Sequence, residues 1–410
     1  MNDFTSISKQ ITSIFTPTEK KDDGIFFTPP SIILTMIDRI LQIPELSIQR
    51  VLEPSCGSCE IITHLLRSID SKHPIDIIGI EKNTQIYDQI QHIFTDDPRV
   101  SLLHRDFLQW DTMNEHKFDL IIGNPPYFVV SKDSVDETFY PLLDGRPNIF
   151  VLFLIHSLQK LRDGGVLAFV LPHNFINCLY YSKIRNHIHN NFAIIDIIDC
   201  MDESFLDTKQ DTFIVILQKK SDKSENNRFG LLANNDIVFH TPTNISIIHQ
   251  LYQESVSLFS MGFDVNVGTV VWNQHKDRLT DDTTQTRLIY SGDIKNNRLT
   301  QIPYKDPCKK HFIMKDGINE PVLVLNRGYG KGKYSFSYCI IDSETPFLIE
   351  NHLIVIRSKT KGTREQLLCR YQTIIDSFCN DKTAQFVDIY FGNNAINTTE
   401  LKHILPIYSS

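Results

Sequence analysis

Four residues with the potential for chemistry, Asn124-Pro125-Pro126-Tyr127, directly follow the apolar run 120–123 (LIIG). An apolar run that ends at a chain breaker predicts a buried strand that stops at a sheet edge. Proline has no N–H and holds the preceding residue extended, so the strand tip is stiff and its carbonyls are free to face a ligand. Asn124 adds a side-chain carbonyl and Tyr127 adds an aromatic face. Two acceptors beside a stacking surface suit an exocyclic amino group on a planar heterocycle, whereas a plain proline turn is the competing interpretation.

A second group of candidate residues lies in the segment 53–59 (EPSCGSC), between a strand-like and a helix-like stretch. Small residues at such a junction let backbone N–H groups approach an anion at the helix N-terminus. A carboxylate ligand would be held there without a cationic side chain. The candidate cofactor residues in this segment are Glu53, Ser55, Cys56 and Gly57.

Acidic residues also close the next two strand-like segments. Glu81 ends one of them and is well placed to accept hydrogen bonds from ribose hydroxyls. Asp106 follows the other, where its carboxylate could accept from an adenine amino group while Phe107 covers the purine face. Each acid alone is weak evidence, because acids often end strands at the solvent boundary. In this order, and with Asn124 closing the fourth strand, they predict one ligand site.

The eight cysteines are scattered through the chain, which predicts reduced thiols in a cytoplasmic setting. Cys56 and Cys59 form a lone Cys-x-x-Cys, a spacing also found in redox and zinc sites. No second pair and no histidine cluster at ligand spacing accompanies them, so we expect no metal. The polar residues 1–13 lack the apolar region of a secretory signal, and no run reaches the length of a membrane helix.

The elements that must position these residues alternate through the first half of the chain. Strands are expected at 50–53, 76–81, 100–104, 118–123, 166–171, 193–198 and 212–217, and helices at 31–41, 60–68, 85–94 and 148–161. Gly164-Gly165 is expected to close the last of these helices as a C-cap. Strands alternating with crossover helices predict an α/β fold with a doubly wound, mostly parallel sheet, whose ligands sit at the carboxyl ends of the strands.

Length and charge indicate a second domain. The chain has 410 residues and a net charge of −8, yet basic residues outnumber acidic ones between 295 and 370. The polar run 219–228 predicts a boundary, which gives an N-terminal extension 1–24, a catalytic domain 25–225 and a β-rich α+β domain 226–410. In the last we expect a strand at 347–356 and a helix at 364–379. A basic stretch favours a polyanionic partner, although a solvated surface explains the charge equally well.

Together these motifs resemble the gamma class of N6-adenine DNA methyltransferases, the TaqI type with a C-terminal target-recognition domain. The matching residues are Thr28-Pro29-Pro30, Glu53 to Cys56, Glu81, Asp106-Phe107, Asn124 to Tyr127, Asn148-Ile149-Phe150, Gly164 to Leu167 and Pro172 to Phe175. Without the resemblance, Thr28 and the prolines after it are an ordinary helix start. Cys59 departs from the family, which commonly has glycine there; a left-handed backbone at that position would be costly for cysteine.

The resemblance implies methyl transfer from S-adenosylmethionine to N6 of a flipped-out adenine in double-stranded DNA. Asn124, Pro125, Pro126 and Tyr127 would be catalytic, and Tyr127 would stack on the target base. Phe205 corresponds to a second stacking residue of the family. The cofactor residues would be Thr28, Glu53, Ser55, Cys56, Gly57, Glu81, Asp106, Phe107 and Asn124.

The second domain would then supply the DNA contacts. The candidate basic residues are Lys309, Lys310, Arg327, Lys331, Lys333, Arg357, Lys359 and Lys361, and a solvated loop is an equally good explanation for any one of them. A monomer with no membrane association is expected, and a separate restriction endonuclease is an optional partner.

Other substrates stay open from the motif alone. Asn-Pro-Pro-Tyr also occurs in methyltransferases that act on a protein glutamine amide or an RNA guanine amino group, because the two-acceptor geometry suits any planar amide or amine. Cytosine N4 is another option, although serine commonly replaces the asparagine there. A non-catalytic DNA-binding relic is the alternative from a different class. The long basic segment behind the motif favours DNA, and the intact motif favours an enzyme.

Overall fold

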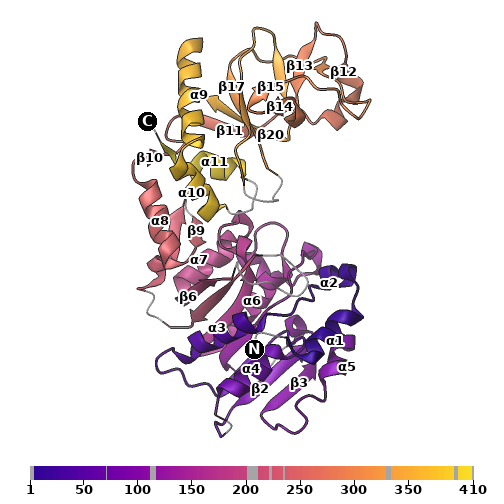
Figure 1. The fold of residues 1–410 in the computed structure, drawn as a ribbon, viewed down its shortest axis with the longest axis vertical. Coiled ribbons are helices and arrows are strands. Elements are labelled where there is room, and N and C mark those ends of the chain that lie inside the picture. Colours follow the sequence, from indigo (N-terminus) through magenta and orange to yellow (C-terminus); the bar gives the residue numbers. More distant parts are fainter. Residues whose placement is uncertain are drawn as a thin grey trace. The chain divides into compact units, whose positions relative to one another are not determined.

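The computed structural model describes residues 4–70, 72–110, 117–200, 211–220, 224–233, 236–328, 334–391 and 396–408. The chain forms two compact units, Met1–Ile245 and Ser246–Ser410 (Figure 1). The predicted stacking residue Phe205 lies outside the described residues, as do the predicted DNA contacts Lys331 and Lys333. Within the described ranges, no helix has both the length and the apolar character needed to cross a lipid bilayer.

The first unit is built on a seven-stranded sheet with the order β3-β2-β1-β4-β5-β7-β6. Its strands are β1 (Arg50–Glu53), β2 (Asp76–Glu81), β3 (Val100–His104), β4 (Phe118–Gly123), β5 (Leu161–Pro172), β6 (Ala193–Asp199) and β7 (Thr212–Gln218). β3, β2, β1, β4 and β5 are parallel neighbours, whereas β7 runs antiparallel between β5 and β6. The expected doubly wound, mostly parallel sheet is confirmed, and the C-terminal ends of β1 to β4 meet at one edge.

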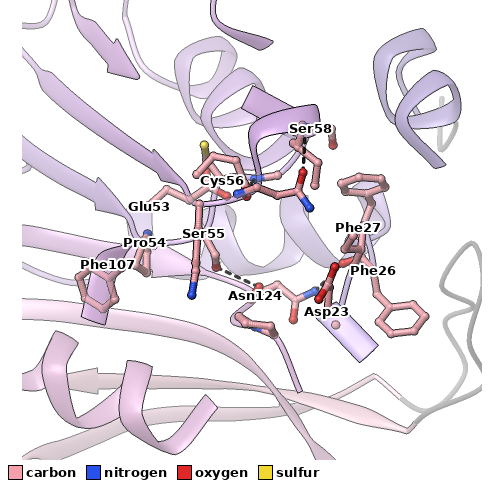
Figure 2. A pocket seen from close by; sticks show the side chains of 18 of the residues that line it. Asp23, Phe26, Phe27, Glu53, Pro54, Ser55, Cys56, Ser58, Phe107 and Asn124 are labelled. Carbon is pink, nitrogen blue, oxygen red and sulfur yellow. Dashed lines mark hydrogen bonds between the residues drawn. The ribbon is translucent and has the colours of Figure 1, made fainter. Parts of the chain in front are cut away.

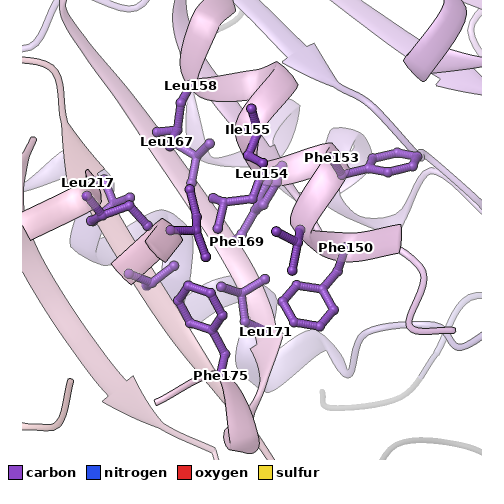
Figure 3. Close-up of a cluster of buried hydrophobic side chains, with 14 of the residues drawn as sticks. Phe150, Phe153, Leu154, Ile155, Leu158, Leu167, Phe169, Leu171, Phe175 and Leu217 are labelled. Carbon is purple, nitrogen blue, oxygen red and sulfur yellow. The ribbon is translucent and has the colours of Figure 1, made fainter. Parts of the chain in front are cut away.

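Both faces of this sheet are buried. Alternate strand residues point to opposite sides, so each strand contributes side chains to both faces. In β5, Leu167, Phe169 and Leu171 belong to one core cluster, whereas Ala168 and Val170 belong to the other. Figure 3 shows α6 (Ile149–Lys160) laying its apolar side chains on the first of these faces. The helices α3 (Pro30–Leu41), α4 (Glu60–Ser68) and α5 (Thr84–Ile90) supply side chains to the opposite cluster.

Local sequence explains where these helices begin and end. Asn148 caps α6 by accepting from the N–H of Phe150, and nearly every residue of α6 is buried, as expected for a helix inside a large core. The expectation for Gly164-Gly165 was wrong. α6 ends at Lys160 with Leu161 already extended, and β5 begins there. Gly164 instead adopts φ +79° within β5, near the irregularity in the pairing with β4.

The first unit continues past the expected boundary. β8 (Gly230–Ala233) and β9 (Asp236–Phe239) form a hairpin, and the buried guanidinium of Arg185 in α7 (Ser182–Asn191) pairs with Asp236. Arg185 also donates to the carbonyls of Ile237, Phe175 and Cys178 at 2.6, 3.0 and 2.7 Å. This set of bonds ties the hairpin to α7, which explains why the compact unit extends to Ile245.

The second unit is rich in short strands. One sheet has the order β11-β20-β17-β18 and another β12-β16-β13-β19. Their strands are β11 (Phe263–Val267), β12 (Leu279–Thr280), β13 (Thr286–Ile289), β16 (Phe312–Ile313), β17 (Val322–Asn326), β18 (Tyr338–Ile341), β19 (Phe347–Ile349) and β20 (Leu353–Ser358). Three helices follow in the chain: α9 (Arg364–Phe378), α10 (Asp381–Tyr390) and α11 (Thr398–His403).

The single strand expected at 347–356 was wrong, because β19 and β20 belong to different sheets. A turn separates them, in which the Glu350 carboxylate accepts from the backbone N–H of His352 at 3.0 Å. The Glu350 N–H still bonds to the Ile289 carbonyl of β13, whereas the Asn351 N–H bonds to Val270, which lies outside both sheets.

The Arg185–Asp236 pair leads to a stability prediction. Asp236→Ala leaves a guanidinium buried without its counter-charge, so we expect the first unit to lose about 3–5 kcal/mol. Asp163→Ala is the matched control, because the Asp163 side chain is 96% exposed and pairs with Lys219 only at the surface. Thermal and urea unfolding of both variants measure the difference. Equal unfolding midpoints for the two variants would contradict the structural role of this pair.

Candidate functional site

A cavity of about 590 Å³ lies in the first unit at the carboxyl edge of β1, β2 and β4. The predicted cofactor residues that line it are Thr28, Glu53, Ser55, Cys56, Gly57, Glu81, Asp106, Phe107 and Asn124, joined by Pro126 of the catalytic motif. Figure 2 shows Asn124 between Ser55 of the β1–α4 loop and the N-terminal residues Asp23 and Phe26. The topology therefore gathers residues that are almost 100 positions apart in sequence into one concave site.

The loop from Glu53 to Cys59 forms one wall. Glu53 is only 2% exposed, and its Oε2 has no hydrogen-bond partner among the described residues. Burial raises the pKa of this carboxyl well above its usual range. Ser55 donates from Oγ to the backbone carbonyl of Asn124 at 3.3 Å, which connects the loop to the catalytic motif. A buried polar atom without a partner is rare in folded proteins, and this one belongs to a residue that lines the cavity.

Cys59 occupies the position where the family commonly has glycine. Its backbone is left-handed, with φ 60° and ψ 25°, immediately before α4. The position therefore does require a conformation that disfavours a side chain, at a cost of about 1–2 kcal/mol. The loop nevertheless closes, because the Cys59 N–H donates to the Cys56 carbonyl at 2.7 Å and both side chains are buried.

Glu81 is held in place by the loop that it faces. Its Oε2 accepts from the N–H of Gly57 at 3.0 Å, and its Oε1 accepts from the N–H of Asn83 at 2.7 Å. Burial nevertheless raises the pKa of the Glu81 carboxyl. The carboxylate thus fixes the tip of the β1–α4 loop while lining the cavity.

Asp106 and Phe107 close the far end of the cavity beyond β3. The Asp106 carboxylate accepts from the N–H of Leu108 at 3.0 Å and pairs with Lys82 at 2.9 Å. Phe107 is almost fully buried and packs on Phe153 of α6, with ring centroids 5.2 Å apart. Phe107 is therefore held by the core, and Asp106 is oriented by two separate donors.

The Asn124 amide has a partner at each end. Its Nδ2 donates to the carbonyl of Phe26 at 3.2 Å, and its Oδ1 accepts from the Tyr127 hydroxyl at 2.6 Å. The same hydroxyl lies 2.8 Å from the carbonyl of Val170 in β5. Burial raises the pKa of Tyr127 well above its usual range, so the hydroxyl stays a proton donor. The Tyr127 ring meets Phe150 edge to face, with centroids 5.9 Å apart.

Two predicted catalytic residues are not part of the described lining, Pro125 and Tyr127. Conversely, the cavity includes residues of the N-terminal extension that the sequence had not indicated as functional: Phe15, Glu19, Asp23 and Gly24. A sequence signal for them exists. Thr16 and Glu19 form a capping box with Pro17 at the first helical position, which marks α2 (Pro17–Asp23), and Gly24 closes it.

The predicted DNA-binding residues are dispersed over the second unit. Lys309 packs on aromatic rings, with its Nζ 4.0 Å from the Tyr290 centroid and 5.0 Å from that of Tyr304. Lys310 pairs with Asp281 at 2.7 Å, and Lys359 with Asp264 at 3.5 Å.

Three other predicted basic residues are exposed in the described part of the chain: Arg327, Arg357 and Lys361. They do not form one cluster along the sheet. Arg327 follows Asn326, which pairs with Leu353 at the start of β20, whereas Arg357 lies near the end of that strand.

Comparison with known proteins places the chain in a family. Residues 1–261 match the family model described as N-6 DNA Methylase, so the chain belongs to this family. It is an adenine-specific DNA methyltransferase that depends on S-adenosylmethionine. The enzyme class and the cofactor inferred from the motifs are thereby confirmed.

Two similar proteins match this chain along nearly its whole length. Type II methyltransferase M.CvrRI of Paramecium bursaria Chlorella virus XZ-6E is 24% identical over 401 residues, covering 95% of each chain. Modification methylase CviBIII of Paramecium bursaria Chlorella virus NC1A is 25% identical over 414 residues, covering 99% of each. Among solved structures, a putative class I S-adenosylmethionine-dependent methyltransferase from Listeria monocytogenes aligns with 22% identity and a TM-score of 0.42, over 52% of this chain and 68% of that one.

The lone Cys-x-x-Cys has a testable consequence. Among the described residues, no three His, Cys, Asp or Glu side chains are grouped as metal ligands. A hydrogen bond with Cys59 and burial both raise the pKa of the Cys56 thiol, and thiolate is the reactive form. We therefore expect alkylation of the native protein to modify the exposed Cys308, Cys369 and Cys379 first, and Cys56 and Cys59 only after unfolding.

Peptide mass spectrometry of the alkylated protein measures this order. A Cys308→Ser/Cys369→Ser/Cys379→Ser variant is the control, and it should take up little reagent until it is denatured. Rapid modification of Cys56 in the native variant would contradict the closed loop.

Proposed function

We propose that the cavity holds S-adenosylmethionine, with Asp106 and Phe107 at its adenine, Glu81 at its ribose and the loop from Glu53 to Gly57, together with Thr28, at its methionine end. The fit of the lining supports this assignment. Carboxylates outnumber cationic side chains around the cavity, which suits a ligand that carries a sulfonium and an ammonium group. Glu53, whose Oε2 has no partner among the described residues, is one of the carboxyl groups that line the cavity.

Asn124 and Pro125 would hold the target amine. The adenine N6 has two hydrogens and a lone pair delocalised into the ring. If the Asn124 Oδ1 and the Pro125 carbonyl each accept one hydrogen, the lone pair is directed out of the ring plane and becomes more localised. The bound cofactor supplies the electrophilic methyl group. This is orientation and electrostatic preorganisation, and it requires no strong base.

The observation that carries the proposal is the position of Asn124 on the same cavity as Glu53 and Glu81. A stiff Asn-Pro-Pro turn at the edge of a cofactor cavity presents its acceptors where a methyl group would be delivered. In duplex DNA the amino group is stacked away, so the base must be flipped out, at a cost of a few kcal/mol. Stacking on Tyr127 offsets this cost, since aromatic–base stacking contributes about 1–3 kcal/mol. The same role is proposed for Phe205.

The second unit is proposed to recognise the target sequence. Relatives of almost the same length are named type II methyltransferases and modification methylases. We therefore propose that this chain acts as a monomeric modification methyltransferase with its own recognition domain, whose restriction endonuclease partner, where there is one, is a separate protein. Arg327, Arg357 and Lys361 are the preferred phosphate contacts, because their side chains are exposed, whereas Lys309, Lys310 and Lys359 already contact rings or carboxylates.

Asn124→Ala is the direct test of this function. The change removes the side-chain acceptor, so we expect methylation to fall by about 10²-fold or more while S-adenosylmethionine binding changes only a few-fold. The wild-type and variant chains are expressed in a methylation-free bacterial host, and the genome is read by single-molecule sequencing. We expect N6-methyladenine at one short recurring motif with the wild type only.

Calorimetric titration with the cofactor separates the two effects. Loss of binding and methylation together would undo the role of Asn124. An unmodified genome with a cofactor-binding wild type would contradict DNA as the substrate.

Cofactor affinity should also depend on pH through Glu81. Because burial raises the pKa of this carboxyl, it protonates at a higher pH than the usual value of about 4.3 for glutamate. The ionised carboxylate is the form that accepts hydrogen bonds from the ribose. Cofactor affinity is therefore full above the raised pKa and is lost as the pH falls through it. Titration of cofactor binding against pH measures this loss, and Glu81→Gln should remove the part that this group causes. Glu137→Gln, at an exposed glutamate, is the control. An unchanged pH profile in Glu81→Gln would contradict the assignment.

A further inference from the structure

The N-terminal segment Thr5–Phe26 lies against the active site at several points. It consists of α1 (Ser6–Ile14), α2 and the turn that follows. Phe15, Asp23 and Gly24 of this segment line the same cavity as Glu53 and Asn124. The segment thus forms a wall of the site, although it precedes every strand of the sheet.

Hydrogen bonds to the buried carboxylate of Glu60, which we call the Glu60 clasp, hold the beginning of this segment in place. Glu60, the first residue of α4, accepts at Oε1 from the Thr5 N–H and the Thr5 hydroxyl, both at 2.8 Å. The Ser8 Oγ lies 2.5 Å from the same Oε1 and 2.8 Å from the Oγ of Ser58. Glu60 is only 4% exposed, and hydrogen bonds to a buried carboxylate are stronger than neutral ones. Its negative charge is also favourable at the N-terminus of a helix.

The other end of the segment packs on the catalytic turn. Gly24 ends α2 with φ 66°. A Cβ placed on Gly24 would lie 2.8 Å from the Pro126 Cβ and 3.0 Å from the Tyr127 backbone nitrogen. No ordinary side chain fits at that separation. The glycine therefore lets the backbone of the segment approach the backbone of the Asn-Pro-Pro-Tyr turn directly.

Two residues later, the Phe26 carbonyl fixes the orientation of the Asn124 amide. A carbonyl oxygen can only accept, so the amide must turn its NH₂ end toward Phe26, at 3.2 Å. The reverse orientation would place two acceptors against each other. The Asn124 Oδ1 is thereby directed to the opposite side, where the Tyr127 hydroxyl meets it at 2.6 Å. The catalytic acceptor thus owes its direction to a residue outside the Asn-Pro-Pro-Tyr motif.

The Tyr127 hydroxyl can leave this acceptor without losing its hydrogen bond. It has one proton and two acceptors in reach, the Asn124 Oδ1 and the Val170 carbonyl at 2.8 Å. When an incoming amine donates to Oδ1, the hydroxyl proton can turn to Val170. The exchange leaves both the Asn124 Oδ1 and the Tyr127 hydroxyl with a partner.

We propose that Thr5–Phe26 is a positioning element of the active site, in which the Glu60 clasp fastens the segment while Gly24 and the Phe26 carbonyl hold the Asn124 amide oxygen toward the target amine. This inference rests on the role proposed above for Asn124. Gly24 and Phe26 are positioning residues, because they act through Asn124 and Pro126. Their effect belongs to the methyl-transfer step and therefore to kcat more than to cofactor affinity.

The test compares Gly24→Ala with Gly145→Ala in the full-length enzyme. Both glycines have a left-handed backbone, with φ 66° and 64°, so both substitutions carry the same backbone cost. A Cβ on Gly145 meets only the ring of the exposed Tyr180, which can move, whereas one on Gly24 meets the catalytic turn. We expect Gly24→Ala to lower kcat by about 10- to 100-fold with little change in the cofactor dissociation constant. Gly145→Ala should keep the wild-type kcat and the wild-type cofactor dissociation constant.

Single-turnover methylation of a DNA duplex and calorimetric cofactor titration give the two readouts. Equal kcat values for the two glycine variants overturn the positioning role alone. Wild-type kcat in Asn124→Ala overturns the role of Asn124 and this inference with it. The two failures are therefore distinguishable.

The clasp supplies a second test that holds even if Gly24→Ala does not fold. Glu60→Gln weakens the bonds to Thr5 and Ser8, and Glu365→Gln is the control, because it removes an exposed first-turn charge from α9. We expect faster hydrogen–deuterium exchange in α1 and a lower kcat in Glu60→Gln only. Faster exchange with unchanged kcat overturns the proposal, because the segment would then be loosened without consequence for the reaction.

Discussion

The parallel pairing of β3, β2, β1, β4 and β5 is the constraint on which the site depends. Parallel strands end at the same edge, so residues that follow different strands become neighbours without any local signal between them. Glu53, Glu81 and Asn124 are gathered in this way. Burial of both sheet faces then fixes the strand positions, because a slip of one residue would exchange the two apolar clusters. The chemistry therefore depends on a rigid core more than on its own loops.

The first unit contains several features that, taken alone, lower the stability of the folded chain. Glu53 and Glu81 are buried carboxylates whose pKa values are raised by burial, and Cys59 adopts a left-handed backbone. Such features persist only where the surrounding structure over-determines them, and they concentrate at functional sites. Here the loop is closed because the Gly57 N–H donates to the Glu81 carboxylate and the Cys59 N–H donates to the Cys56 carbonyl. A cysteine at position 59 is tolerated because the N–H of this residue and its buried thiol both serve the loop.

Much of the catalytic unit could be predicted from the sequence, because its strands are apolar runs with clear breakers. β1, β2 and β4 have the expected bounds, so the positions of Glu53, Glu81 and Asn124 at their ends follow directly. The errors occur where a breaker is missing or has another use. No glycine or proline marks the turn between β19 and β20, and Gly164 serves an irregular strand instead of a helix end. The N-terminal wall could not be predicted, because the contacts of Glu60 with Thr5 and Ser8 span more than 50 residues.

The net charge of a segment was the sequence feature that told least about function, and Lys309 shows why. A lysine in a basic stretch predicts a phosphate contact, but its ammonium group packs on the rings of Tyr290 and Tyr304. The net charge of a segment counts such residues together with exposed ones such as Arg327. The Asn124 site is different, because the role proposed for it depends on the direction of its amide oxygen and not on charge. An amide oriented by one acceptor, the Phe26 carbonyl, keeps its oxygen available at any salt concentration, whereas phosphate contacts weaken as salt rises. In the proposed function, catalysis and DNA affinity therefore rest on different physical terms and are assigned to separate parts of the chain.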